Sequence, residues 1–263
     1  MFFEERYKIF KEHRVINWHD HVWYGADGNL DVPRMERLID HAAVVGIDMT
    51  VISLPLVAGF NTPEMVERAN DTVYSVLKRY PNVTRGFAYI DPIMGKKTVE
   101  REIRRCVEDL GFIGVKLYHQ FYMDEPEQYP VIETCIDLDI PILMHAAKCD
   151  EGIHLTNAQH MINAARRYPE ATFQMAHIGG GGDWYWQLKG VEDVKNLYID
   201  IAGSVHDSEM VERTVKVFGA ERVLFACDMS YSSSVGKILS ADITEEELKI
   251  ILDNPHFARY LDR

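Results

Sequence analysis

The stretch PEMVERANDTVYSVLKRYP at residues 63–81 is followed two residues later by TRGFAYIDP at residues 84–92. Apolar residues recur at helical spacing in the first segment, whereas the second is a short apolar run typical of a buried strand. Pro81 closes the first segment, and a proline at that place favours the end of a helix. The two segments therefore predict one helix followed by one strand.

Short apolar runs of this kind recur along the whole chain, and amphipathic segments such as residues 97–111 and 156–169 separate them. The runs lie at residues 14–18, 49–55, 84–92, 111–118, 139–145, 171–177, 196–202 and 222–228. Eight strand–helix units in 263 residues are typical of a (β/α)8 barrel, so we expect one α/β domain, a TIM barrel, over residues 1–263. An open doubly wound sheet is the alternative, but no GxGxxG or GxxxxGK phosphate loop follows the first run.

Composition excludes several classes of partner. The chain carries 41 Asp and Glu against 28 Lys and Arg, a formal charge of -13, which repels a nucleic-acid backbone. No apolar run approaches the roughly 20 residues that span a bilayer. The four cysteines show no close-paired spacing, and the N-terminus lacks a signal-peptide pattern. We therefore expect a cytoplasmic protein with a small-molecule substrate and no nucleic-acid or membrane partner. The acidic composition is compatible with a homo-oligomer and does not require one.

Two histidines follow the first apolar run, in the sequence NWHDHVWYG at residues 17–25. Alternate residues of a strand share a face, so His19 and His21 should point the same way and Asp20 the other way. The carboxyl ends of barrel strands form the catalytic end of this architecture. The pair alone is also compatible with two ordinary histidines.

Three further runs end on a polar residue: His145, His177 and Asp228. Buried polar groups at such places are costly unless they are paired or bound to a ligand. Together with His19 and His21 they predict a shared metal site. Imidazole and carboxylate ligands suit Zn²⁺, with Mn²⁺, Fe²⁺ or Co²⁺ possible, and the absence of thiolates at these positions argues against a structural zinc site.

Three other residues are candidates for substrate binding. If Val115 and Leu117 pack outward, Lys116 points into the barrel; the alternative is a lysine that reaches solvent at the strand tip. His119 follows closely and is either within reach of substrate or an ordinary loop histidine. Trp23 is a candidate pocket wall, although aromatic residues more often lie in the core.

The motifs HDH, GVKLYHQF, PILMHAA, AHIGGG and ACD, each at the end of an expected strand, resemble those of the amidohydrolase superfamily. The likeness is to the amidohydrolase 2 branch related to aminocarboxymuconate semialdehyde decarboxylase, and it covers nearly the whole chain. That branch contains hydrolases, lactonases, decarboxylases and hydratases, so the motifs do not specify a reaction. Tyr118 stands where the family usually has a histidine.

The resemblance implies roles for five residues. His19, His21, His145 and Asp228 would bind one divalent metal, and His177 would act beside it as a general acid or base, with Asp228 also able to accept a proton. A second metal bridged by a carbamylated lysine is a further arrangement in the superfamily.

That second arrangement would involve Lys116, and we expect one metal rather than two. The function expected first is a hydrolase that uses metal-activated water on a small organic acid, amide, ester or lactone. A non-oxidative decarboxylase or hydratase of the same fold is the alternative. A barrel that binds metal or ligand without turnover is the alternative from another class.

Overall fold

The computed structural model describes residues 3–56, 61–146, 156–178 and 184–262. They contain one sheet of eight parallel strands whose spatial order follows the chain order. The strands are β1 (Ile16–His21), β2 (Met49–Ser53), β3 (Thr84–Tyr89), β4 (Gly114–Leu117), β5 (Ile142–Met144), β6 (Phe173–Met175), β7 (Leu197–Asp200) and β8 (Val223–Leu224).

The last strand returns to the first, so the sheet forms a nearly closed barrel. The backbone N–H of Trp18 donates to the carbonyl of Phe225 at 3.0 Å, and the N–H of Asp228 donates to the carbonyl of His19 at 2.7 Å. The predicted single (β/α)8 barrel is therefore confirmed.

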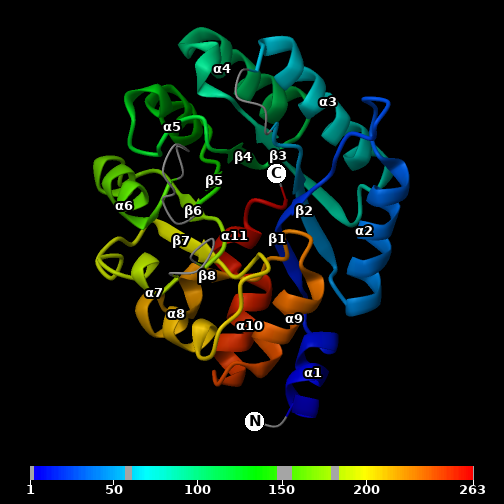
Figure 1. The fold of residues 1–263 in the computed structure, drawn as a ribbon, viewed down its shortest axis with the longest axis vertical. Helices are drawn as coiled ribbons and strands as arrows, with labels where there is room; N and C mark the ends of the chain where they lie inside the picture. The colour runs from blue at the N-terminus through cyan, green and yellow to red at the C-terminus, as the bar shows by residue number, and fades with distance from the viewer. Residues whose placement is uncertain (1–2, 57–60, 147–155, 179–183, 263) are drawn as a thin grey trace.

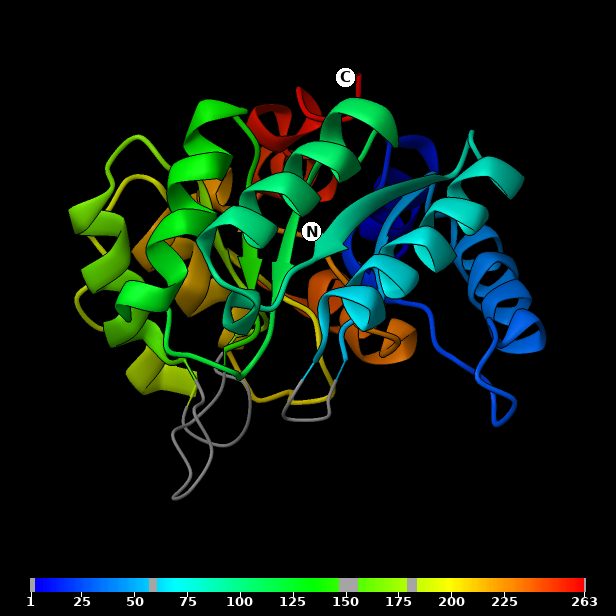
Figure 2. The ribbon, with the colours of Figure 1, turned by 90° about the horizontal axis from the view of Figure 1, so that it is seen from above.

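Helices surround the strands on the outside of the barrel (Figure 1). They are α1 (Phe3–Glu12), α2 (Val32–Val45), α3 (Pro63–Arg79), α4 (Lys96–Arg104), α5 (Tyr129–Asp137), α6 (Ala158–Arg167), α7 (Trp184–Gln187), α8 (Met210–Phe218), α9 (Tyr231–Ser240), α10 (Glu245–Asp253) and α11 (Pro255–Ala258). A π-helical turn (Arg105–Asp109) continues α4. Figure 2 shows α11 at the end of the barrel from which the strand arrows point away.

The unit predicted from residues 63–92 forms as expected, because its ends carry helix-capping residues. The Thr62 hydroxyl accepts a hydrogen bond from the backbone N–H of Met65, and Pro63 occupies the first turn of α3. The helix ends at Arg79, before Pro81, and β3 begins at Thr84. The predicted and observed ends of these two elements agree within three residues.

The barrel interior is filled with side chains at the end closed by α11. Ile16, Trp18 and Phe87 lie there with Phe257 of α11, whose ring centroid is 5.2 Å from that of Trp18. Gly114 is needed at this level because a Cβ would lie 2.5 Å from the Phe87 ring. The outward-facing strand residues pack against the helices in a separate cluster. This end of the barrel therefore serves packing, which leaves the opposite end for chemistry.

The structure leaves several expectations as they were. No helix among the described residues has the length and apolar character needed to cross a membrane. Cys106, Cys135 and Cys227 are free thiols, whereas Cys149 and the glycines at 179–182 lie outside the described residues. The cytoplasmic location and the homo-oligomeric state stay predictions.

Candidate active site

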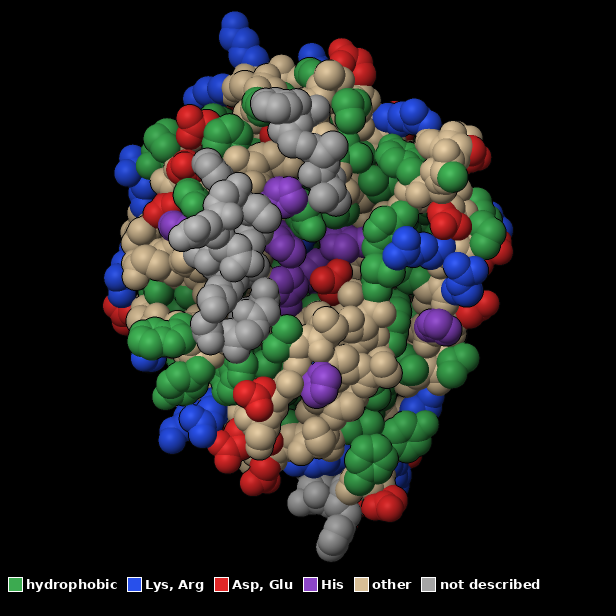
Figure 3. Space-filling view, in the orientation of Figure 1, with side chains coloured by type: hydrophobic (Ala, Val, Ile, Leu, Met, Phe, Trp, Pro, Cys, Tyr) green, Lys and Arg blue, Asp and Glu red, His purple; other side chains and the backbone are tan. Residues whose placement is uncertain are grey.

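Residues from opposite ends of the chain meet at the carboxyl end of the barrel. The Nε2 atoms of His19 and His21 lie 3.2 Å apart, and His21 Nε2 lies 3.3 Å from a carboxylate oxygen of Asp228. One ligand atom from each residue falls within 4.8 Å of the others. Figure 3 shows histidine side chains gathered in the central hollow beside an acidic side chain. The predicted convergence of these three residues is confirmed.

A β-bulge in β1 aims both histidines inward. Asn17 pairs with Thr50 and Asp20 pairs with Ile52, so two residues of β1 oppose one residue of β2. Trp18 packs in the barrel interior, and His19 also points inward because the extra residue resets the alternation of faces. The first strand was predicted at residues 14–18, and this prediction was wrong at its end, because β1 runs to His21.

Buried partners fix the orientation of the two imidazole rings. His19 Nδ1 lies 3.1 Å from a carboxylate oxygen of Asp200 in β7, and His21 Nδ1 lies 3.0 Å from the Ser53 hydroxyl. With the Nδ1 proton donated to these oxygens, the Nε2 lone pairs of both rings face the same point. A histidine held by a carboxylate in this way is the common arrangement for a metal ligand.

Sequence reasoning missed Asp200, although it occupies a recognisable position. It interrupts the apolar run NLYIDIA at residues 196–202, and its side chain is fully buried. Besides His19, Asp200 accepts hydrogen bonds from Gln174 Nε2 at 2.8 Å and from the backbone N–H of His177 at 2.8 Å. One carboxylate thus positions both a candidate ligand and a candidate acid–base residue.

Lys116 and His177 complete the cluster. Lys116 is fully buried and its Nζ lies 3.2 Å from His19 Nε2, while Val115 and Leu117 pack among the outer residues, which confirms the predicted direction of the lysine. The His177 ring stacks 6.2 Å from the ring of His19. Within the described chain, His177 Nδ1 is buried without a hydrogen-bond partner.

Two of these residues have an unusual backbone conformation. His177 has φ +36° and Asp228 has φ +43°, in the left-handed region that side chains with a Cβ seldom adopt. Such strain costs about 1–3 kcal/mol per residue and concentrates at functional sites. Both strained residues lie just beyond a strand end, where the chain turns its side chain toward the barrel axis.

The protonation states suit metal binding at neutral pH. Burial lowers the pKa of His21 to about 4 and lowers the pKa of His19 well below its usual value, so both rings are neutral. Burial would raise the pKa of Asp228, but in acid the positive charges of His19 and its neighbours outweigh burial and lower that pKa to about 2. Two neutral imidazoles and one carboxylate are a fitting ligand set for a divalent metal.

The remaining predicted residues lie around this cluster. The His145 ring lies 5.0 Å from the His177 ring and 4.5 Å from the Tyr118 ring, and His145 is not part of the close three-residue group. His119 contacts Tyr118 at 4.3 Å between ring centroids. Trp23 packs edge-on against His21 at 6.0 Å. Their roles in binding metal or substrate stay predictions.

Asp20 points away from the two histidines, as predicted, and organises the segment after β8. Its carboxylate accepts hydrogen bonds from the Tyr231 hydroxyl at 2.8 Å, Asn17 Nδ2 at 2.8 Å and the backbone N–H of Met229 at 3.2 Å. Burial raises the pKa of Asp20 to about 7. These contacts tie the turn that carries Asp228 to β1.

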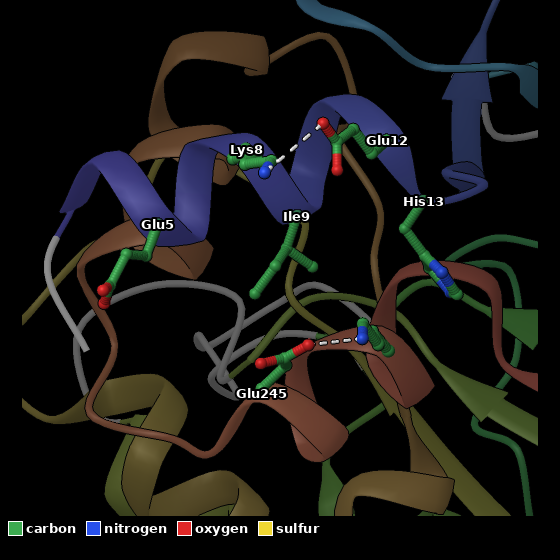
Figure 4. A pocket seen from close by; sticks show the side chains of 7 residues that line it. Glu5, Lys8, Ile9, Glu12, His13 and Glu245 are labelled. Carbon is green, nitrogen blue, oxygen red and sulfur yellow. Dashed lines mark hydrogen bonds and ion pairs between the residues drawn. The ribbon is translucent and has the colours of Figure 1, made fainter.

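A cavity of about 340 Å³ opens beside the cluster, lined among others by His177, Gly203, Ser204, Asp228 and Ser230. Its size suits a small molecule. A second hollow, of about 570 Å³, lies between α1 and α10 (Figure 4). Its charges pair with one another, Lys8 with Glu12 and Lys249 with Glu245, so it is a solvated groove. The cavity at His177 is therefore the candidate active site.

Comparison with known proteins agrees with this site. The Amidohydrolase family model matches residues 16–240, a span that begins with β1 and includes Asp228. A gamma-resorcylate decarboxylase from a Polaromonas species is 24% identical over 256 residues, covering 76% of this chain and 77% of the relative. A 2-keto-4-carboxy-3-hexenedioate hydratase from a Sphingobium species is 22% identical over 255 residues, covering 84% and 69%.

Solved structures share the fold. A 2,6-dihydroxybenzoate decarboxylase from Rhizobium has a TM-score of 0.72 at 18% identity, covering 95% of this chain and 98% of that chain. A 5-carboxyvanillate decarboxylase from Novosphingobium aromaticivorans, solved with bound manganese, has a TM-score of 0.74 at 16% identity, covering 96% and 97%. The named relatives are decarboxylases and a hydratase, so they favour the alternative function expected from sequence over the hydrolase.

Proposed function

Because the chain belongs to the amidohydrolase family and is an enzyme of that fold, we propose that it is a metal-dependent lyase that decarboxylates a small aromatic or unsaturated carboxylic acid without oxidation. One observation carries the proposal: His19, His21 and Asp228 converge at the mouth of the barrel, beside the unpartnered Nδ1 of His177. The relatives supply the choice of reaction, since three carboxylate decarboxylases are among them.

The metal proposed here is a single divalent ion held by His19, His21 and Asp228, with His145 as a fourth ligand. Mn²⁺ is the first candidate because related structures contain it, and Zn²⁺ also suits this set of ligands. A bound divalent ion supplies positive charge that polarises the carboxylate and a neighbouring oxygen of the substrate.

The residues of the chain would then handle charge and protons. Decarboxylation replaces a bond from carbon to carboxylate with a bond from carbon to hydrogen, so one proton must reach carbon as carbon dioxide leaves. His177 Nδ1 would deliver that proton, and Asp228 would assist, because both line the cavity. Lys116 would hold the negatively charged substrate, since its ammonium group is buried beside His19.

Hydration of an unsaturated acid is the second candidate function. The hydratase likeness covers more of this chain than the decarboxylase likeness, 84% against 76%. The same residues would serve, because adding water to a double bond also requires one proton at carbon. The two reactions differ in whether carbon dioxide appears or water is consumed.

A substrate screen with Mn²⁺-loaded protein tests the proposal. The panel would contain 2,6-dihydroxybenzoate, other hydroxybenzoates and unsaturated polycarboxylic acids, with an ester and a lactone for comparison. We expect carbon dioxide release without water uptake and, in D₂O, one deuterium in the product at the carbon that lost its carboxylate. Hydrolysis of the ester or lactone without decarboxylation would contradict the proposal and restore the hydrolase.

A further inference from the structure

A second cavity, of about 220 Å³, lies next to the candidate active site on the side of α2. It is lined by side chains of the segment after β1, of α2 and of the segment after β8, among them Trp23, Arg34, Arg37, His41, Met229 and Tyr231. None of these residues belongs to the metal-binding group or to the proposed acid–base pair.

The walls of this cavity are continuous with the active site. Trp23 contacts the ring of His21, and Met229 directly follows Asp228. Tyr231 donates to Asp20, whose carboxylate points away from the two histidines and also accepts from the backbone N–H of Met229, so it fixes the turn that carries Asp228. A molecule of small size with one end at His21 and Asp228 therefore has this cavity as its neighbour.

The cavity carries positive charge that the protein itself does not neutralise. Among the described residues, no carboxylate lies within ion-pair distance of Arg34 or Arg37, whereas Arg79, Arg101 and Arg104 on outer helices all pair with carboxylates. The imidazole of His41 adds a further polar group to the lining. In a chain of formal charge -13, two unpaired guanidinium groups at one cavity attract an anion.

Arg34 is held in place for such an anion. Its guanidinium carbon lies 3.9 Å from the centre of the Trp23 ring, and its Nη2 contacts the Met229 sulfur at 3.6 Å. Stacking fixes the plane of the guanidinium group but occupies none of its strong hydrogen-bond capacity. Arg34 also lies in the first turn of α2, which begins at the mouth end of the barrel. A guanidinium group fixed in this way binds a carboxylate through two parallel hydrogen bonds.

We propose that this cavity binds a second carboxylate of the substrate, so that the enzyme acts on a dicarboxylic or tricarboxylic acid. One carboxylate lies at His19, His21 and Asp228, and Arg34 binds the other, with Arg37 adding to the positive potential. The inference rests on the proposed function for the first half of this statement only. Arg34 is then a residue that determines specificity, without contact with the reacting carbon.

Calorimetric titration of the Mn²⁺-loaded full chain tests the inference with two matched pairs of probes, glutarate against butyrate and isophthalate against benzoate. The wild type should bind one dicarboxylate or both about 10-fold or more tightly than the matched monocarboxylate, as one charge-assisted pair implies. Arg34→Gln should remove that preference and leave monocarboxylate affinity unchanged. Arg34→Lys should retain part of it, because the charge remains but the planar fork is lost.

Arg167→Gln is the matched control. Arg167 also stacks on an aromatic ring, 4.3 Å from Tyr129, but it ends α6 at the opposite end of the barrel. This variant should bind all four probes as the wild type does. Equal affinity of the wild type for both members of each pair, or a preference that survives in Arg34→Gln with an unchanged melting temperature, would overturn the inference.

The same titrations without metal separate this inference from the proposed function. A preference that depends on Arg34 but not on Mn²⁺, in protein without decarboxylase activity, would fault the proposed function and support the anion site. Decarboxylation with no dependence on Arg34 would fault the anion site alone.

Discussion

Two buried polar clusters in this protein differ in how completely their members satisfy one another. Outside the barrel, Glu102 accepts hydrogen bonds from Asn70 at 2.8 Å and from Arg105 at 2.8 Å, and Asn70 also bonds both ways with the backbone of Tyr89. At the mouth, His19 Nε2 faces His21 Nε2 and Lys116 Nζ, each at 3.2 Å. The members of the first cluster are hydrogen-bonded to one another, whereas the second brings nitrogen lone pairs and positive charge together at one point.

This difference separates structural from functional burial. A complete network stabilises the native chain, and removing one member leaves its partners unsatisfied. A cluster that turns several lone pairs toward one point leaves those atoms without complementary partners, and such an arrangement is typical of a functional site. Changes at the mouth should therefore alter activity far more than folding, and changes at Glu102 should do the reverse.

The largest effect is expected from the double variant His19→Ala/His21→Ala. Elemental analysis should find about one divalent ion per chain in the wild type and almost none in the variant. Activity should fall at least about 1,000-fold, because the charge that polarises the substrate is lost. His206→Ala, an exposed histidine near the mouth, is the control and should keep both. Full metal content in the double variant would show that the ligands lie elsewhere.

His177→Asn should separate chemistry from metal binding. We expect kcat to fall about 100-fold to 10,000-fold, the usual contribution of general acid–base catalysis, with metal content and melting temperature unchanged. Steady-state kinetics and elemental analysis on the same preparation measure this. Unchanged kcat would remove His177 from the proposed mechanism.

Glu102→Ala should have the opposite profile. Removing this carboxylate breaks its hydrogen bonds from Asn70 and Arg105, although Arg105 keeps its pair with Asp71, so the free energy of unfolding should fall by about 3 kcal/mol. Urea unfolding measures the loss, and kcat of the remaining folded enzyme should stay close to the wild-type value. A loss of activity in fully folded Glu102→Ala would mean that the two clusters are coupled.

The smallest expected effect is an acid dependence of stability. Burial alone would raise the pKa of Glu102, but hydrogen bonds from Arg105 and Asn70 outweigh it and lower the pKa below its usual value. A lowered native pKa stabilises the fold above the unfolded pKa of about 4.3, and this contribution is lost as the pH falls below that value. Glu102→Gln should flatten that part of the unfolding profile below about pH 4.3. An identical slope in both proteins would assign the acid sensitivity to other groups.

Local pattern was sufficient to predict the barrel and the direction of three side chains at its mouth. Each of the eight strands overlaps its predicted apolar run, and the alternation of faces correctly placed His19, His21 and Lys116. These features depend on periodicity within a few residues, which a sequence shows directly.

Features that depend on contacts between distant segments were not predicted. Asp200 meets His19 from 181 positions away, and the Asn70–Glu102 pair spans 32 positions. The bulge that extends β1 to His21 depends on its pairing with β2 and has no residue signature of its own. Nor does sequence alone show that Arg34 lacks a carboxylate partner, because pairing depends on where the outer helices lie.

The bulge in β1 divides one strand into two halves that answer to different demands. Below it, Ile16 is held by the packed interior; above it, His21 faces His19 and Asp228 in the candidate metal site. Deleting Trp18 or His19 would remove the bulge and restore the regular alternation of faces, so that Ile16 and His21 would both still point inward but only one inward side chain would lie between them instead of two. The bulge thus lets two adjacent residues of one strand both point inward, Trp18 into the packed interior and His19 into the candidate metal site.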